Sequence, residues 1–330
     1  MDVGSILDIP VRRPNFRKRV NTCRTDRERF KAIELLKAKN LECMRKIGSR
    51  GNGVQPFHCV SKGTAKIADI FCNKIGLPLE TKMLTLEIYE RFIVGLLNKI
   101  LESRKSRQYD VCSSDIGGLK TIFQNECNTM PLYFIACIQV AAKFDNRDLP
   151  LLSPTETVSY LSKRTSCNTT ELDLMTAEMK VISCMDYELN FVTRYEAVED
   201  LIATRKNEQF ILLSDEIFAK SVEVLDMLYR NHRKIFDDFL LHMGLNVTKS
   251  EKVFNKELQQ AEYDAVWIAG ATIVAATRLT RHKKFEEADF EKLSQIILFE
   301  LADDLSDIRS ERELRTLSYV LFHAFAELEM

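Results

Sequence analysis

Glycine and proline are scarce in this chain of 330 residues. It contains 11 Gly and 7 Pro, together 18 positions, where average usage would give roughly 40. The last proline is Pro154, and the 176 residues after it contain only Gly244 and Gly270. Because these residue types break helices and form turns, their scarcity excludes a fold rich in β-hairpins and predicts an all-α protein.

A charge excess of either sign is also missing. Lys and Arg number 47 against 48 Asp and Glu, which leaves a net charge of −1. The whole chain therefore has no electrostatic attraction to nucleic acid or to an anionic membrane, and direct nucleic-acid binding is disfavoured. The apolar stretches 131–142 and 265–277 are too short to span a bilayer. The N-terminus has no apolar signal core, so we expect neither secretion nor membrane insertion.

The sequence lacks the motifs that mark an enzyme, a cofactor site or a metal site. It has no glycine-rich phosphate loop, no His-Glu-x-x-His and no Gly-x-Ser-x-Gly. The five histidines do not pair at metal-ligand spacing. The nine cysteines are odd in number and form no Cys-x-x-Cys pair, so we interpret them as reduced thiols in an intracellular protein. The sequence thus predicts a non-catalytic protein with no cofactor and no metal.

Residues 1–24 form a basic segment that we interpret as a disordered tail. Its charges cluster around one proline, at Arg12, Arg13, Arg17, Lys18 and Arg19. Such a cluster is typical of a nuclear-import signal or a nucleic-acid contact. A plain solvated tail is an equally good interpretation of so short a run.

Residues 25–53 are predicted to form a helix and a linker. Thr25 and Glu28 have the spacing of a capping box, in which each side chain accepts a hydrogen bond from an unpaired backbone N–H at the helix start. We expect the helix to reach Gly48 and the glycine-rich residues 48–53 to form a flexible linker. The helix must dock on something, because its apolar residues form one stripe: Phe30, Ile33, Leu36, Leu41, Met44 and Ile47.

Residues 54–192 are predicted to form a first helical fold. Its helices are expected at about 60–75, at 80–101, from Pro131 to Phe144, from Pro154, and from Thr169 or Thr170 to Met185. The helix after Pro131 is apolar on nearly every face, which indicates a buried central helix. Residues 103–129 are polar and contain two adjacent glycines, which predicts an inserted loop.

Residues 193–330 are predicted to form a second helical fold. Its helices are expected at about 195–205, 211–243, 261–280, 287–302 and 311–328. The third of these contains Val274-Ala275-Ala276, an echo of Val140-Ala141-Ala142 in the third helix of the first fold. The predicted architecture is therefore two tandem five-helix folds, preceded by an N-terminal helix and a basic tail.

Three segments of the first fold resemble the cyclin box of the cyclin family. Residues 86–93, Leu-Glu-Ile-Tyr-Glu-Arg-Phe-Ile, resemble its second helix, and residues 136–144, ending in Ala-Ala-Lys-Phe, resemble the end of its third helix. Residues 174–178 and 187–189 resemble its fifth helix and the exit from it. Within the family the chain is similar to the meiotic crossover-site-associated group, which has a long insertion and a Leu-Asp-Met-Leu-Tyr motif, here at 225–229. The Gly-Ala-Thr-Ile-Val-Ala-Ala helix of the second fold adds to this similarity.

The resemblance implies a binding surface for a cyclin-dependent kinase of the cyclin-dependent kinase 2 type. In cyclins, the lysine that ends the third helix and a glutamate of the fifth grip the kinase, and Lys143 and Glu178 match them. The residues that match the apolar floor under the kinase's movable helix are Phe144, Ile182, Tyr187 and Leu189. Without the resemblance, the two charges would be taken as an exposed ion pair and the apolar four as core.

The resemblance also implies a regulatory role in the nucleus, on meiotic chromosomes. There the protein would promote crossover designation or maturation, with recombination factors as partners. The alternative is a kinase-independent helical adaptor that binds recombination or replication factors at crossover sites. Gly63, Thr64 and Ile67 stand where cell-cycle cyclins carry a substrate-docking patch, and this departure favours the adaptor. The helix at 25–47 has two candidate seats: a bound kinase, as in cyclins, or the chain's own second fold.

Overall fold

The computed structural model describes residues 25–50, 60, 62–107, 116–145, 153–164, 169–245, 261–281, 286–306 and 310–329. All regular secondary structure in these ranges is helical, which confirms the predicted all-α class. None of the helices described combines the length and apolarity that a membrane crossing needs. The basic cluster at 12–19 and linker residues 51–53 lie outside the described residues.

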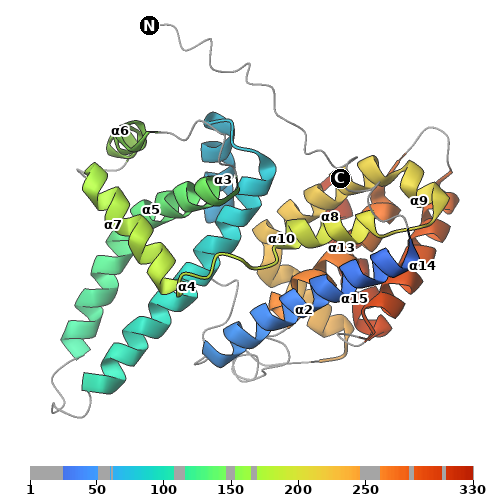
Figure 1. Cartoon of the computed structure of the whole chain (residues 1–330), viewed down its shortest axis with the longest axis horizontal. Coiled ribbons are helices and arrows are strands. Elements are labelled where there is room, and N and C mark those ends of the chain that lie inside the picture. Colours follow the sequence, from blue (N-terminus) through green and yellow to red (C-terminus); the bar gives the residue numbers. More distant parts are fainter. Residues whose placement is uncertain are drawn as a thin grey trace, which may run out of the picture. The chain divides into compact units, whose positions relative to one another are not determined.

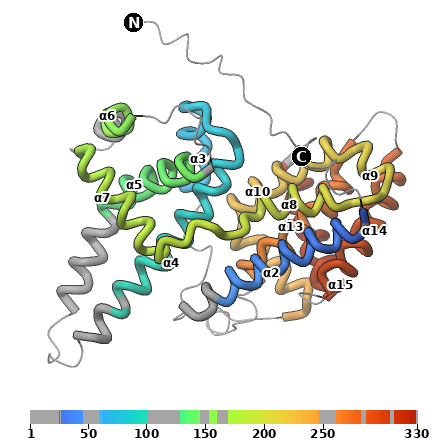
Figure 2. The backbone as a smooth tube through the Cα atoms, viewed as in Figure 1, coloured from blue at the N-terminus to red at the C-terminus, as the bar shows by residue number. Residues whose placement is uncertain are grey.

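The chain divides into two compact units (Figure 1). Unit 1 contains residues Thr64–Asn190, and unit 2 contains Phe191–Met330 together with most of helix α2. The helices of unit 1 are α3 (Lys62–Lys74), α4 (Leu79–Arg107), α5 (Ile116–Asp145), α6 (Pro154–Arg164) and α7 (Glu171–Cys184). Those of unit 2 are α2 (Asp26–Arg50), α8 (Arg194–Ala203), α9 (Glu208–Leu212), α10 (Ser214–His242), α13 (Ala265–Leu279), α14 (Glu287–Asp304) and α15 (Glu311–Glu329). Residues 185–193 connect α7 to α8 (Figure 2).

Capping boxes fix several helix starts where the sequence predicts them. At the start of α2, the N–H of Thr25 donates to Glu28 Oε2 at 3.0 Å and the N–H of Glu28 donates to Thr25 Oγ1 at 3.2 Å. At the start of α6, the N–H of Ser153 donates to Glu156 Oε2 and the N–H of Glu156 donates to Ser153 Oγ. Each box satisfies backbone N–H groups that have no partner inside the helix. These starts are therefore set by local sequence.

The apolar second half of α5 is the centre of unit 1. Every residue from Tyr133 to Ala142 is buried, and α4 and α7 pack against this helix. Tyr89 of α4 meets Phe134 edge to face, with ring centroids 5.1 Å apart. The polar residue of the run, Gln139, donates to Thr157 Oγ1 of α6 at 2.8 Å. The prediction of a buried central helix is confirmed.

Two predictions about the start of that helix are wrong. The helix does not begin at Pro131, because α5 starts at Ile116 and the proline lies inside it. Pro131 is exposed, and a proline inside a helix removes one backbone hydrogen bond. Residues 103–107 and 116–129, predicted to belong to a loop, are helical. Polarity alone was a poor guide here, because Glu, Lys, Arg and Gln are good helix formers.

Helix α13 has the central place in unit 2. Its residues from Ala265 to Thr277 are all buried, and α8, α10, α14 and α15 pack against it. The hydroxyl of Thr272 donates to the carbonyl of Ile268 at 2.8 Å, so a polar group inside this core has a partner. The helix expected over 261–280 is interrupted at Asp264, which caps α13.

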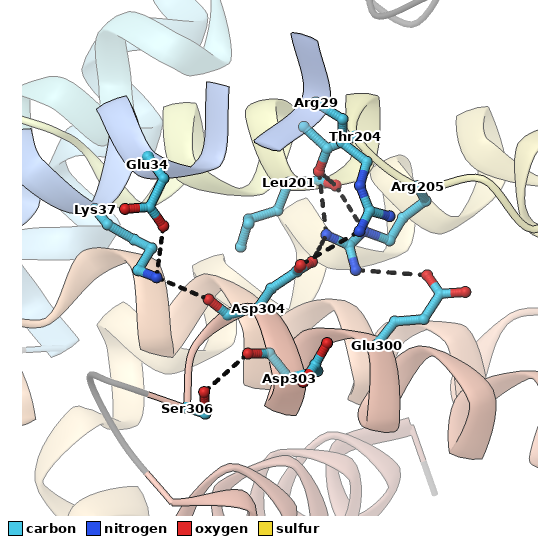
Figure 3. Close-up of polar contacts among 10 residues, drawn as sticks. All are labelled: Arg29, Glu34, Lys37, Leu201, Thr204, Arg205, Glu300, Asp303, Asp304 and Ser306. Atoms are coloured by element: carbon cyan, nitrogen blue, oxygen red, sulfur yellow. Dashed lines mark hydrogen bonds and ion pairs between the residues drawn. The ribbon is translucent and has the colours of Figure 1, made fainter. Parts of the chain in front are cut away.

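Helix α2 is seated on unit 2 by polar contacts with two acidic residues. Asn40 Nδ2 donates to Asp264 Oδ1 at 2.8 Å in a buried contact. Arg29 Nη2 lies 3.4 Å from Asp304 Oδ1, and Lys37 Nζ donates to the Asp304 carbonyl at 3.1 Å (Figure 3). Of the two candidate seats, the chain's own second fold is the one observed.

The predicted docking stripe of α2 is only partly correct. Ile33 and Leu36 are buried, whereas Phe30 is 65% and Leu41 is 47% exposed. The buried face of α2 includes Asn40, which is 2% exposed and bonds Asp264, the cap of α13.

Asp304 also binds a buried arginine. Its Oδ2 lies 2.5 Å from Nη2 of Arg205, whose side chain is fully buried (Figure 3). A second carboxylate, that of Glu300, lies 3.5 Å from Arg205 Nη1. Burial lowers the pKa of Arg205, and the charge of Asp304 opposes that shift. Such a pair tolerates the loss of one partner poorly, because an uncompensated charge then stays buried.

We predict that Asp304→Asn destabilises the protein by about 3 kcal/mol, because Arg205 loses its nearest counter-charge. Chemical denaturation followed by circular dichroism measures the change. Glu327→Gln in the exposed pair with Lys234 is the matched control, expected within about 0.5 kcal/mol of wild type. Equal effects of the two variants would contradict a special role for Asp304.

Cys43, Cys72, Cys137 and Cys184 are free thiols, and the last three of these are buried. Burial raises the pKa of Cys72 from 9.0 to about 12, while the nearby Lys82 opposes the shift. Burial also raises the pKa of Cys137. Because the thiolate is the reactive form, these side chains are unreactive at neutral pH.

We predict that iodoacetamide at pH 8 modifies the half-buried Cys43 in the folded protein and leaves Cys72 and Cys137 unmodified. Mass spectrometry of tryptic peptides measures this, with urea-unfolded protein as the control in which all three react. The raised pKa of Cys72 also makes the folded state lose stability as pH rises from 9.0 to about 12. Over that range only the unfolded thiol releases its proton. Native modification of Cys72 at the rate of Cys43 would contradict the assignment.

Candidate functional site

The predicted kinase-binding residues lie on α5, on α7 and in the turn after α7. Helix α7 starts at a capping box, with the N–H of Thr170 donating to Asp173 Oδ2 at 2.8 Å and the N–H of Asp173 donating to Thr170 Oγ1 at 3.2 Å. Hydrogen bonds from the backbone N–H and then the hydroxyl of Thr170 lower the pKa of Asp173. The box is therefore formed at neutral pH and lost when acid protonates that carboxylate.

The two faces of α7 have different surroundings. Leu174, Ala177, Val181 and Cys184 are buried, and their helical spacing turns one face toward the core of unit 1. On the other side, Leu172, Met175 and Met179 are 72%, 58% and 56% exposed. Their spacing of three and four residues places them on one stripe. The structure thus leaves an apolar stripe of α7 in solvent.

Lys143 and Glu178 form an ion pair between α5 and α7. Lys143 lies in the last turn of α5, and its Nζ donates to Glu178 Oε2. The lysine side chain is 48% exposed and the glutamate side chain 15%. A pair with this access to solvent contributes little to stability and can open at small cost to bind other groups.

The four residues matched to the apolar floor all have access to solvent. Phe144 is 49% and Tyr187 is 67% exposed, and Ile182 and Leu189 are half-buried. Ile182 follows Glu178 by one helical turn, so the two share a face of α7. The ion pair thus has exposed Phe144 next to its lysine and half-buried Ile182 one turn from its glutamate, and the N–H of Tyr187 donates to the carbonyl of Ile182.

The turn after α7 has an unusual backbone. Asp186 and Tyr187 both have positive φ, +52° and +62°, a left-handed conformation that is uncommon outside glycine. The N–H of Tyr187 donates to the carbonyl of Ile182 at 2.9 Å, and the N–H of Asp186 donates to Ser183 at 3.1 Å. These bonds use carbonyls that the end of α7 leaves unpaired.

Two features of this region escaped the sequence interpretation. The stripe of Leu172, Met175 and Met179 was not singled out, because a helix of mixed polarity does not reveal which apolar side faces the core. Gly95, in the middle of α4, was not singled out either, although a glycine inside a helix is a signal of close packing. Among the described residues, no group of three His, Cys, Asp or Glu side chains is arranged to hold a metal ion.

Comparison with known proteins finds distant relatives. The chain is 22% identical over 197 residues to cyclin N-terminal domain-containing protein 1 of Homo sapiens, and 21% identical over 197 residues to the protein of that name in Mus musculus. The match covers 60% of this chain and 58% of each relative's length. No family model matches the chain, and no solved structure matches it. The similarity supports a cyclin-like family.

We predict that Glu178→Gln and Lys143→Met each change the free energy of unfolding by less than about 1 kcal/mol, because the lysine of the ion pair that they remove is half exposed. Chemical denaturation measures both variants. A loss of stability as large as that of Asp304→Asn would show that the pair holds the fold rather than serving a surface.

Proposed function

We propose that this chain is a non-catalytic, cyclin-like regulatory protein that binds a cyclin-dependent kinase through the ends of α5 and α7. The observation that carries the proposal is the pairing of Lys143 with Glu178, with exposed Phe144 next to the lysine and half-buried Ile182 one turn from the glutamate. The similarity to cyclin N-terminal domain-containing proteins adds support.

The chemistry of this surface suits a protein helix. Exposed Phe144 and Tyr187 offer apolar area that gains free energy when a partner covers it. Aromatic side chains of this kind often dominate interface energies. Lys143 donates hydrogen bonds and Glu178 accepts them, so the opened pair can bind backbone groups at the two ends of a partner helix.

Binding at this surface would act on the kinase by shifting its conformational equilibrium. A partner helix held here would favour the kinase arrangement in which its lysine and glutamate pair and position ATP. We extend the proposal to the nucleus and to meiotic crossover sites, where the protein would promote crossover designation or maturation. That extension rests on the family resemblance of the sequence motifs.

We predict that the double variant Lys143→Ala, Glu178→Ala lowers co-purification with a cyclin-dependent kinase 2-type kinase by at least about tenfold, because both polar anchors are lost. The matched control is Lys234→Ala, Glu327→Ala, which removes an exposed ion pair of unit 2. Undiminished binding of the double variant would contradict the proposed surface.

A phosphate-transfer assay on the wild-type complex distinguishes the two functions. The regulatory proposal expects activity above that of the kinase alone. A stable complex that stays inactive would favour the kinase-independent adaptor.

A further inference from the structure

Helices α4 and α7 touch backbone to backbone at Gly95. A Cβ atom added to this glycine would lie 2.1 Å from the carbonyl oxygen of Cys184 and 3.0 Å from its carbonyl carbon. Real Cβ atoms essentially never come within 3.0 Å of another heavy atom. No side chain therefore fits at Gly95 unless α7 moves away from α4.

One turn further along α4, Lys99 binds the same end of α7. Its Nζ donates to the carbonyl of Ser183 at 2.5 Å. The last turn of α7 contains no basic residue of its own, so Lys99 supplies a cation where the helix dipole is negative. Lys99 thus bonds the carbonyl of Ser183, and Gly95 leaves room for the next carbonyl, that of Cys184, to approach α4.

The chain leaves this anchored end through the left-handed turn at Asp186 and Tyr187. Two adjacent non-glycine residues in this conformation cost free energy, and such strain persists only where the surroundings fix it. Cys184 and Met185, just before the turn, are 4% and 2% exposed, so the turn starts from a rigid point. At its far side, Tyr187 is 67% exposed and has its N–H bonded to Ile182.

We infer that Gly95 and Lys99 are positioning residues that hold the end of α7 against α4 and thereby fix the turn that presents Tyr187 to a partner. This inference rests on the proposed function for its partner, a kinase helix, but the fixing of the turn belongs to the free protein. A rigid, exposed aromatic side chain loses little conformational freedom when it is covered, which favours affinity.

The experiment compares Gly95→Ala and Lys99→Met with wild type in the full chain. Amide hydrogen exchange of Asp186 and Tyr187 is measured first, without kinase. We expect exchange at these two amides to be at least about tenfold faster in both variants, because the turn opens locally. Exchange in α13 should stay at the wild-type rate, and Lys99→Arg should restore protection by keeping a cation at Ser183.

The matched control is Gly270→Ala in the middle of α13. A Cβ there would meet the ends of the Leu305 and Leu314 side chains, at 3.2 and 3.4 Å, rather than backbone. It should leave exchange at Asp186 and Tyr187 unchanged. If Gly95→Ala does not fold, Lys99→Met and Lys99→Arg decide the question. Wild-type exchange at Tyr187 in Lys99→Met would overturn the inference.

The dissociation constant for the kinase is measured next. We expect about a tenfold increase for Gly95→Ala and a smaller increase for Lys99→Met. Faster exchange with unchanged affinity would overturn the role of the turn in binding. If wild-type protein binds no kinase, the proposed function fails, and the exchange rates still decide whether Gly95 and Lys99 fix the turn.

Discussion

The fold of each unit depends on one helix that is apolar on nearly all its sides. Such a helix has no face that can remain in water, so amphipathic helices must enclose it. In unit 2, α13 is enclosed by α8, α10, α14 and α15. In unit 1, the buried run of α5 ends at Ala142, and the next residues, Lys143 and Phe144, are exposed. The candidate site therefore begins directly after the last residue of α5 that must be buried.

Polar contacts fix the rotation and position of α2, which apolar burial alone does not fix. Burial of Ile33 and Leu36 would allow α2 to rotate or slide, because apolar contacts are not directional. The bond from Asn40 to Asp264 fixes its rotation, and the contacts of Arg29 and Lys37 with Asp304 fix its position along unit 2. Since Asp264 caps α13 and Asp304 ends α14, α2 bonds to the ends of two helices. The other helices of unit 2 thus fix both the rotation and the position of α2.

Helix starts that depend only on residues close together in the sequence could be predicted. Thr25, Ser153 and Thr170 mark helix starts because each cap is complete within four residues. The start of α5 was mispredicted because Pro131 suits a first turn by its own chemistry, while its position inside a long helix depends on residues far before it. The contact of Gly95 with Cys184 joins positions that are distant in the chain, and no local pattern specifies it. In the candidate site, the family motifs named Lys143, Glu178 and Tyr187, but the exposure of the α7 stripe required the packing of unit 1.

The exposed stripe of α7 has no explanation in the folding of unit 1. Its inward residues, Leu174, Ala177 and Val181, already anchor the helix to the core. Leu172, Met175 and Met179 contribute no comparable burial, and large apolar side chains gathered on a surface favour association with other molecules. The left-handed turn at the end of the same helix caps the last carbonyls of α7 at a cost in backbone strain, and it ends in an exposed tyrosine. A partner that covered the stripe and Tyr187 would gain free energy from the apolar area buried, and the fixed turn would keep the tyrosine in place for that contact.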